Sequence, residues 1–167
     1  ADAFGCPVAI DTDVNGAALA EARWGAGQGK RLCLYLTIGT GVGGGAIIHG
    51  RPLHGLLHPE MGHLQVPVPA TPGVVDSRCQ CPFHDACLEG YVSGPAIAAR
   101  WGARAETLPA GHPAWTDVAE TLARGLVSII TTLAPRRIIL GGGVMIVVTL
   151  SVVTRSVVVM WSKLMGV

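Results

Sequence analysis

The chain has 167 residues, half of them hydrophobic, and its formal net charge at pH 7 is +1. This length predicts a single globular domain, within the usual ~100–200 residues per domain, and the balanced charge excludes a strongly basic protein that attracts nucleic acid through its overall field. Because no run of Lys or Arg indicates a polybasic surface, we expect neither nucleic acid nor a membrane as a partner.

The first part of the chain predicts a strand, a helix and a hairpin. The sequence VAI before Asp11 is typical of a short strand. The segment DVNGAALAEARWGAGQG predicts a helix that Asp13 or Asn15 caps and that Gly25 follows. Two apolar, β-branched runs then surround GTGVGGG in RLCLYLTIGTGVGGGAIIHGRPLHG, which predicts strand, turn and strand.

The rest of the chain alternates loops, helices and one strand. Residues 66–78 are rich in proline and are expected to form a loop, and residues 88–101 a helix. After a second loop over residues 102–113, TDVAETLARGLVSIITTLAP is apolar at helical spacing, with Thr116 or Asp117 as its cap. RRIILGGGV is typical of a buried strand that ends in glycines, and the alternation predicts an α/β layer architecture.

The C-terminal segment differs in composition. VMIVVTLSVVTRSVVVMW is almost entirely β-branched or apolar, but Arg155 and several Ser and Thr interrupt it below the ~18 apolar residues that a membrane span needs. A pair of core strands is the favoured interpretation. A membrane helix and a segment outside the fold are the alternatives. We therefore divide the chain into residues 1–145 and an atypical hydrophobic tail, residues 146–167.

Potential metal ligands gather in HPEMGHLQVPVPATPGVVDSRCQCPFHDACLEG. Cys81, His84 and Cys87 form C-x-x-H-x-x-C, which one loop can wrap around an ion. His63 can supply a fourth ligand from upstream, and two thiolates with two imidazoles suit a closed, structural Zn²⁺ site. Cys79 either replaces one of the four or lies nearby without binding. Separately buried thiols and surface histidines are the alternative.

Cysteine usage also indicates a compartment. Five cysteines are too few for a secreted disulfide scaffold, and three of them alternate with histidine, which favours a metal in a reducing compartment. The sequence after Ala1 shows no charged and apolar leader. We expect a cytoplasmic protein.

Two further features suit phosphate chemistry. GTGVGGG, residues 39–45, leaves backbone N–H groups open to phosphate, although a hairpin turn without ligand explains this element equally well. It is neither a P-loop, since no Gly-Lys-Ser/Thr follows, nor a dinucleotide fingerprint, since Ala46 begins a strand. Asp13 in TDVN is either a helix cap or a carboxylate that accepts a hydroxyl proton in phosphoryl transfer.

Five motifs in order resemble one family: TDVN followed by GAALAE, LTIGTGVGGGAIIHG, HPEMGH, CPFHDACLEGYVSGPA and IILGGGVM. They are similar to the repressor/ORF/kinase (ROK) family of sugar kinases, above all to its zinc-containing bacterial fructokinases, over residues 7–145. The resemblance implies an α/β fold, an actin-like ATPase (ribonuclease H-like) lobe, incomplete, with a zinc-pinned loop.

The resemblance also implies roles for individual residues. Asp13 matches the catalytic base, and Asn15 of the same motif matches a sugar contact. Glu60 and Glu89 match the glutamates that contact sugar hydroxyls, and His63 belongs both to the substrate-binding residues and to the zinc ligands. One zinc would join the segments that carry the two glutamates, without activating the nucleophile, because four protein ligands leave no open position.

Three bound species follow from the resemblance: ATP, a Mg²⁺ held mainly by the ATP phosphates, and a structural Zn²⁺. The zinc ligands are His63, Cys81, His84 and Cys87. The ATP-binding residues are Gly39, Thr40, Gly41, Gly43, Gly44, Gly141, Gly142 and Gly143. We expect the two glycine segments to face one cleft.

The activity implied is ATP-dependent phosphorylation of a hexose, D-fructose to D-fructose 6-phosphate, with glucose or mannose as alternative substrates. Family members are commonly homodimers. We expect the family's N-terminal lobe, and with it one half of the ATP clamp, to be absent from this chain, so the activity of the isolated chain stays open. A sugar-sensing ROK transcriptional regulator is the non-enzymatic alternative, and a zinc hydrolase with Glu60 as base would need an open metal position.

Overall fold

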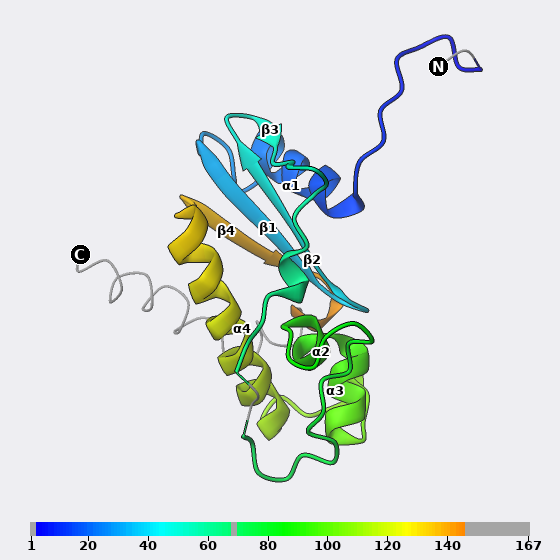
Figure 1. Cartoon of the computed structure of the whole chain (residues 1–167), viewed down its shortest axis with the longest axis vertical. Coiled ribbons are helices and arrows are strands. Elements are labelled where there is room, and N and C mark those ends of the chain that lie inside the picture. Colours follow the sequence, from blue (N-terminus) through cyan, green and yellow to red (C-terminus); the bar gives the residue numbers. More distant parts are fainter. Residues whose placement is uncertain (1–2, 68–69, 146–167) are drawn as a thin grey trace.

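The computed structural model describes residues 3–67 and 70–145 of the chain. Its centre is a four-stranded sheet in the order β3-β2-β1-β4 (Figure 1). The α/β fold class predicted from the sequence is confirmed.

The strands reproduce the predicted hairpin and last strand. β1 (Leu32–Ile38) and β2 (Val42–Ile48) pair antiparallel around a tight turn, and the short β3 (Arg51–Pro52) continues from β2. β4 (Arg137–Gly141) pairs with β1 in parallel. β4 is an edge strand of the described sheet and is only half-buried, so the prediction of a buried strand was wrong in that respect.

The helices differ in length. They are α1 (Asp13–Trp24), α2 (Glu89–Val92), α3 (Gly94–Trp101) and α4 (Pro113–Leu133), with 3₁₀ turns at Met61–His63 and Ala105–Thr107. Helices α2 and α3 lie beyond one end of the sheet (Figure 1).

Side chains of β1 alternate between two cores, as the period of a strand requires. Cys33 packs with Ala18 of α1 in the smaller core, whereas Leu34 and Leu36 belong to the larger core that also contains Leu122 of α4. The sheet is therefore covered by helix on both faces, which is the layer arrangement expected for an α/β fold.

The start of α1 is fixed by Thr12. Its hydroxyl accepts a hydrogen bond from the backbone N–H of Asn15 at 3.2 Å, so Thr12 is the cap and the prediction that Asp13 or Asn15 fills this position was wrong. Gly25 follows the helix end as predicted. Asp13 is thereby the first helical residue, with its side chain exposed to solvent.

The strand predicted before Asp11 is not formed. Residues 8–10 have no strand hydrogen bonds among the described residues, and Ile10 is 96% exposed. A β-branched sequence becomes a strand only beside another strand, and this segment extends away from the sheet (Figure 1).

The helix predicted over residues 88–101 is broken at Ser93. Ser93 has an extended backbone (φ −68°, ψ 159°), and its hydroxyl accepts a hydrogen bond from the N–H of Ala96 at 3.4 Å. This serine ends α2 and caps α3, and Pro95 in the first turn of α3 reinforces the break.

The long helix α4 begins before its predicted cap. His112 Nδ1 accepts a hydrogen bond from the N–H of Ala114 at 3.2 Å, so Thr116 and Asp117 lie inside the helix and do not cap it. The helix ends at Leu133, two residues before Pro135, as predicted.

A buried ion pair fastens the proline-rich loop to the helices. Arg100 Nη2 of α3 lies 2.8 Å from Asp117 Oδ2 of α4, and both side chains are at most 2% exposed. The Thr71 hydroxyl donates to the other carboxylate oxygen of Asp117, and the N–H of Val75 donates to the Arg100 carbonyl at 2.7 Å. The described part of residues 66–78 is thus a loop, as predicted, with a definite anchor.

Replacement of Asp117 by Asn is expected to destabilise the chain by ~3–5 kcal/mol, because it leaves the buried Arg100 charge without its carboxylate partner. Urea unfolding measures this free energy. The matched control is Glu106→Gln, which breaks the exposed pair of Arg104 and Glu106 and should change stability by ~0–1 kcal/mol. Equal stabilities for the two variants would contradict the anchoring role.

The segment over residues 144–161, predicted to form core strands or alternatively a membrane helix, lies outside the described residues except for Val144 and Met145, which are helical. Among the helices that are described, none combines the length and the apolar character needed to cross a membrane.

Candidate functional site

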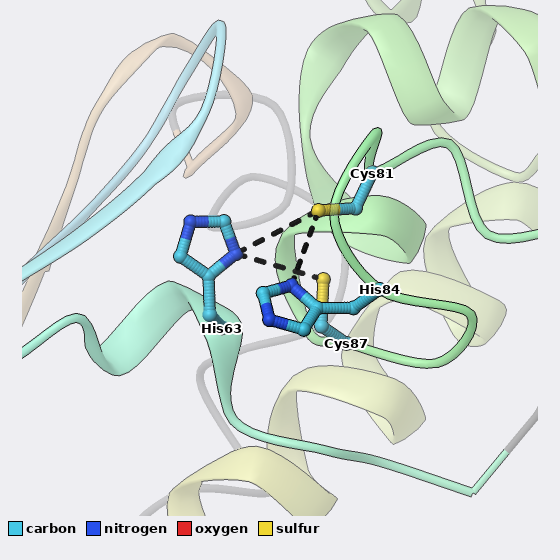
Figure 2. Close-up of side chains that lie close together, drawn as sticks. All are labelled: His63, Cys81, His84 and Cys87. Atoms are coloured by element: carbon cyan, nitrogen blue, oxygen red, sulfur yellow. Dashed lines mark hydrogen bonds between the residues drawn. The ribbon is translucent and has the colours of Figure 1, made fainter.

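The four predicted metal ligands converge on one point (Figure 2). His63 comes from the 3₁₀ turn, whereas Cys81, His84 and Cys87 come from the loop that leads into α2. Cys81 Sγ lies 3.7 Å from His63 Nδ1 and 3.4 Å from His84 Nδ1. Cys87 Sγ lies 3.9 Å from His63 Nδ1, and all four ligand atoms are within 4.8 Å of one another.

These separations fit a tetrahedral zinc ion. Ligand atoms at the usual Zn–N and Zn–S distances stand about 3.3–3.8 Å apart, close to the spacing observed here. The donor set of two sulfurs and two imidazole nitrogens is also one that zinc prefers. Burial raises the pKa of the Cys87 thiol to about 12, and a bound cation would favour its thiolate form.

Cys79 lies beside this cluster and is not one of its four members. Its Sγ is 4.0 Å from Cys87 Sγ. On the other side it packs against Gly90, where a Cβ atom would collide with the Cys79 sulfur. Of the two alternatives for Cys79, replacing one of the four ligands or lying nearby, the geometry favours the second.

Backbone hydrogen bonds also join the two segments that the cluster connects. The N–H of Leu88 donates to the carbonyl of Leu64 at 2.9 Å, and the N–H of Val66 donates to the carbonyl of Ala86 at 3.3 Å. The segment after Glu60 and the segment before Glu89 are therefore already paired by the chain itself. A metal would tighten this pairing.

The two predicted sugar-binding glutamates differ in environment. Glu89, the first residue of α2, accepts a hydrogen bond from the N–H of Val42 at 2.9 Å, so it is tied to the β1–β2 turn. Gly41 makes this approach feasible, because a Cβ there would stand 2.6 Å from Glu89 Oε2. Glu60 is exposed, and its Oε1 lies 2.8 Å from His58 Nε2.

Asn15 is buried behind the exposed Asp13 at the start of α1. Its Nδ2 donates to Asp11 Oδ1 at 2.8 Å, and its Oδ1 has no hydrogen-bond partner within the described residues. His54 Nε2 lies 3.2 Å from the same Asp11 oxygen. Hydrogen bonds from Asn15 and Thr12 hold the pKa of Asp11 below its ordinary value.

The sequence analysis did not predict that Asp11 and His54 lie within hydrogen-bonding distance of Asn15. The acidic residue two positions before Asp13 was the available signal for the first of them. His54 carried no signal, because only the fold brings the segment after β3 back to α1.

A cavity of about 500 Å³ receives both glycine segments. Gly39 and Thr40 of the β1–β2 turn, Gly143 after β4 and the start of α3 line it. The two segments meet because β1 and β4 are parallel neighbours, with Thr37 opposite Gly141. The expected common cleft is confirmed as geometry, and Arg104 and Glu106 are lining residues that the sequence did not indicate.

Four other predicted glycines are packed against neighbouring groups. An added Cβ would crowd a neighbour at three of them, Gly44 against Met61, Gly141 against Tyr35 and Gly142 against Ile38, whereas at Gly43 it would make only ordinary contact with Val14. Helix α1 can approach β2 closely for the same reason, since a Cβ on Gly45 would stand 2.8 Å from the Val14 carbonyl oxygen. Much of the run over residues 39–45 is therefore explained by packing, and only its first two residues, Gly39 and Thr40, line the cavity.

Comparison with known proteins identifies the family. The profile described as ROK family matches residues 1–162. The chain belongs to the ROK family. Among its relatives is a fructokinase from Zymomonas mobilis subsp. mobilis, 51% identical over 146 residues, which are 86% of this chain and 48% of that protein. The resemblance inferred from the motifs is thereby confirmed, and the chain spans about half the length of the relatives it matches.

Solved ROK structures show the same fold. The ROK hexokinase from Thermus thermophilus superposes with a TM-score of 0.70 at 33% identity, covering 86% of this chain and 53% of that one. A ROK family glucokinase from Streptomyces griseus, solved in complex with glucose and AMPPNP, gives 0.65 at 26% identity, with coverage of 90% and 59%. The predicted assignment to a lobe of this kinase fold agrees with both.

Proposed function

We propose that this ROK chain is part of an ATP-dependent hexose kinase that converts D-fructose to D-fructose 6-phosphate. The observation that carries the proposal is the 51% identity to the Zymomonas mobilis fructokinase. The cavity that receives both glycine segments and the cluster of four metal ligands support it.

Asp13 is proposed as the general base. It lies exposed at the first turn of α1, where its carboxylate can meet a sugar hydroxyl. The carboxylate takes the proton of the 6-hydroxyl as that oxygen attacks the γ-phosphorus of ATP and the bond to ADP breaks. Phosphoryl transfer needs little more than this proton acceptor, alignment and charge neutralisation.

The sugar is held, in this proposal, by Asn15, Glu60, Glu89 and His63. The Nδ1 atom of His63 faces the two sulfurs, so Nε2 remains to hydrogen-bond with a sugar hydroxyl. The unpaired Oδ1 of Asn15 is a further acceptor for a hydroxyl. The carboxylates provide the charge-assisted acceptors, which are stronger than neutral ones.

The metal site would be closed by four protein ligands, and a zinc bound there supplies geometry and no catalytic position. His63, Cys81, His84 and Cys87 would hold it. The residues around it then keep Glu60 and Glu89 at a constant separation.

ATP is proposed to occupy the cavity lined by Gly39, Thr40 and Gly143. Mg²⁺ would be bound mainly through the ATP phosphates, as is usual for this ion. The other glycines named in the sequence analysis would act by letting neighbouring segments pack closely beside this cavity. We further propose a cytoplasmic protein that acts as a homodimer, with hexose and ATP as its partners and with residues 1–145 as the sugar- and ATP-binding region.

A coupled ADP-release assay with fructose, glucose and mannose tests the proposal. It is run on the chain alone and on the chain joined to the portion of the Zymomonas mobilis fructokinase that it does not span. Fructose is expected to give the highest kcat/KM, by about ten-fold or more, because the site selects hydroxyl geometry by hydrogen bonds. Absence of turnover with every hexose in both forms would contradict a kinase, and hexose binding without turnover would favour the sugar-sensing regulator.

Glu60→Gln is expected to raise KM for fructose about 10- to 100-fold, because a hydrogen bond to a charged group contributes ~1.5–3 kcal/mol. Its kcat should stay nearly constant, since Glu60 does not hold the transferred proton. Steady-state kinetics of the joined form measures both constants. Glu120→Gln, an exposed position on α4, is the matched control. A loss of kcat at unchanged KM would contradict the sugar-binding role.

A further inference from the structure

Cys79 is a thiol that the proposed zinc site does not use. The four-ligand cluster is complete without it, yet its sulfur stands only 4.0 Å from that of Cys87. A disulfide requires an S–S distance of ~2.0 Å, so a shift of about 2 Å by side-chain rotation would connect the two. A ligand sulfur and a spare sulfur are thus immediate neighbours.

Cys79 is also accessible to small molecules. Together with Arg78 and Tyr91 it lines a surface hollow of about 370 Å³. The Arg78 side chain at this hollow is 84% exposed, so solvent reaches the edge of the pocket. An oxidant of the size of hydrogen peroxide can therefore reach the Cys79 sulfur from the surface.

Packing keeps Cys79 beside its neighbour. The backbone of Gly90 leaves no space for even one added carbon next to the Cys79 sulfur. The N–H of Gln80 donates to the Gly90 carbonyl at 3.0 Å, which ties the chain next to Cys79 to the start of α2. The sulfur is confined between Gly90 and Cys87.

We propose that Cys79 is an oxidant-sensitive thiol that forms a disulfide with Cys87 and so releases the metal from the site. The inference rests on the proposed zinc site and does not depend on kinase activity. Of the cysteines at the cluster, Cys79 is the one whose sulfur stays free when the four ligands are bound, so a peroxide reaches it first.

The reaction has two steps. The Cys79 sulfur attacks hydrogen peroxide, the O–O bond breaks, and the products are a sulfenic acid on Cys79 and one water. The Cys87 sulfur then attacks the Cys79 sulfur, giving up its bond to the metal, and the S–O bond breaks. The hydroxide that leaves takes up a proton and becomes the second water. Two electrons pass from the two sulfurs to the peroxide.

Two readouts on the zinc-loaded 167-residue chain test this. Zinc release after addition of hydrogen peroxide is followed with a chromogenic chelator, and the disulfide is located by mass spectrometry of proteolytic peptides. The variant is Cys79→Ser, with Cys79→Ala as a second replacement should serine disturb the fold. The matched control is Cys6→Ser, which removes an exposed cysteine elsewhere in the chain.

The unmodified chain and Cys6→Ser are expected to release their zinc and to yield a peptide linking Cys79 to Cys87. The Cys79 variants should bind zinc normally and release it at least about ten-fold more slowly, since only the coordinated thiols remain. A thiol reductant with added zinc should restore the site.

Equal release rates in the Cys79 variants, a Cys81–Cys87 linkage, or loss of zinc binding on replacing Cys79 would overturn the proposal. A purified chain without zinc would overturn both this and the zinc site, whereas a failed kinase assay would leave these readouts unchanged.

Discussion

Replacement of Asp13 by Asn is expected to lower kcat by about 10²–10⁴ while KM for the sugar stays within a few-fold, which is the usual contribution of general base catalysis. Asparagine keeps the shape and one hydrogen-bonding oxygen but cannot accept the hydroxyl proton. The loss therefore falls on the chemical step and not on binding. Thr12 caps α1, so the substitution should leave the helix start intact.

Steady-state kinetics of the chain joined to the unspanned portion of the Zymomonas mobilis fructokinase measures this effect. Asp76→Asn, which alters a carboxylate paired with Arg78 in the loop before the cluster, is the matched control and should keep kcat. Thermal unfolding of both variants separates catalysis from stability. Full turnover by Asp13→Asn would contradict the general-base role and leave Asp13 only as a favourable charge at the start of α1.

Loss of zinc is the second large effect. The purified chain should contain about one zinc, and Cys87→Ser should contain almost none, because a closed structural site loses most of its zinc affinity when one of its four ligands is removed. A structural zinc contributes about 10–16 kcal/mol of apparent binding free energy, part of which stabilises the loop that it connects. Hydrogen exchange over residues 58–90 should therefore become faster in Cys87→Ser and after chelation.

Metal analysis by mass spectrometry, together with hydrogen exchange, measures both parts of this prediction. Cys6→Ser is the control and should keep one zinc and its exchange protection. A chain that holds no zinc after careful reduction, or a residue 58–90 segment whose protection survives chelation, would contradict the structural role of the metal.

The features that sequence patterns predicted well are those set by local spacing. The hairpin around GTGVGGG and the end of α4 before Pro135 follow from turn residues and periodicity, and the structure contains both. The four predicted metal ligands also meet as expected, since three of them lie within seven residues of chain. Only His63 had to be brought in from a distance, and the motif HPEMGH indicated it.

Two of the missed features depend on side-chain contacts that hydrophobic periodicity does not report, one local and one long-range. Ser93 breaks a helix because its hydroxyl finds Ala96, and Asp117 lies inside a helix because Arg100 neutralises it there. Periodicity reports neither contact. The strand expected before Asp11 failed for a related reason: strand propensity has no effect without a neighbouring strand.

The glycine-rich run over residues 39–45 was predicted correctly in one respect and incompletely in another. Its composition correctly indicated that other groups approach the backbone closely. Many of these groups belong to the protein itself and not to a ligand. Gly41 makes room for Glu89 and Gly45 for α1, and only Gly39 with Thr40 reaches the cavity. Sequence alone could not divide the run between packing and ligand binding, because both require a missing side chain.

A zinc is proposed to join the segments of Glu60 and Glu89 and so to form the sugar site. Calorimetric titration of D-fructose into the zinc-loaded and the zinc-stripped protein tests it most directly. We expect fructose binding to the zinc-loaded form, a dissociation constant at least about ten-fold higher after stripping, and recovery with one equivalent of zinc, because ordering the loop would then oppose binding. Equal fructose affinity with and without zinc would contradict the claim.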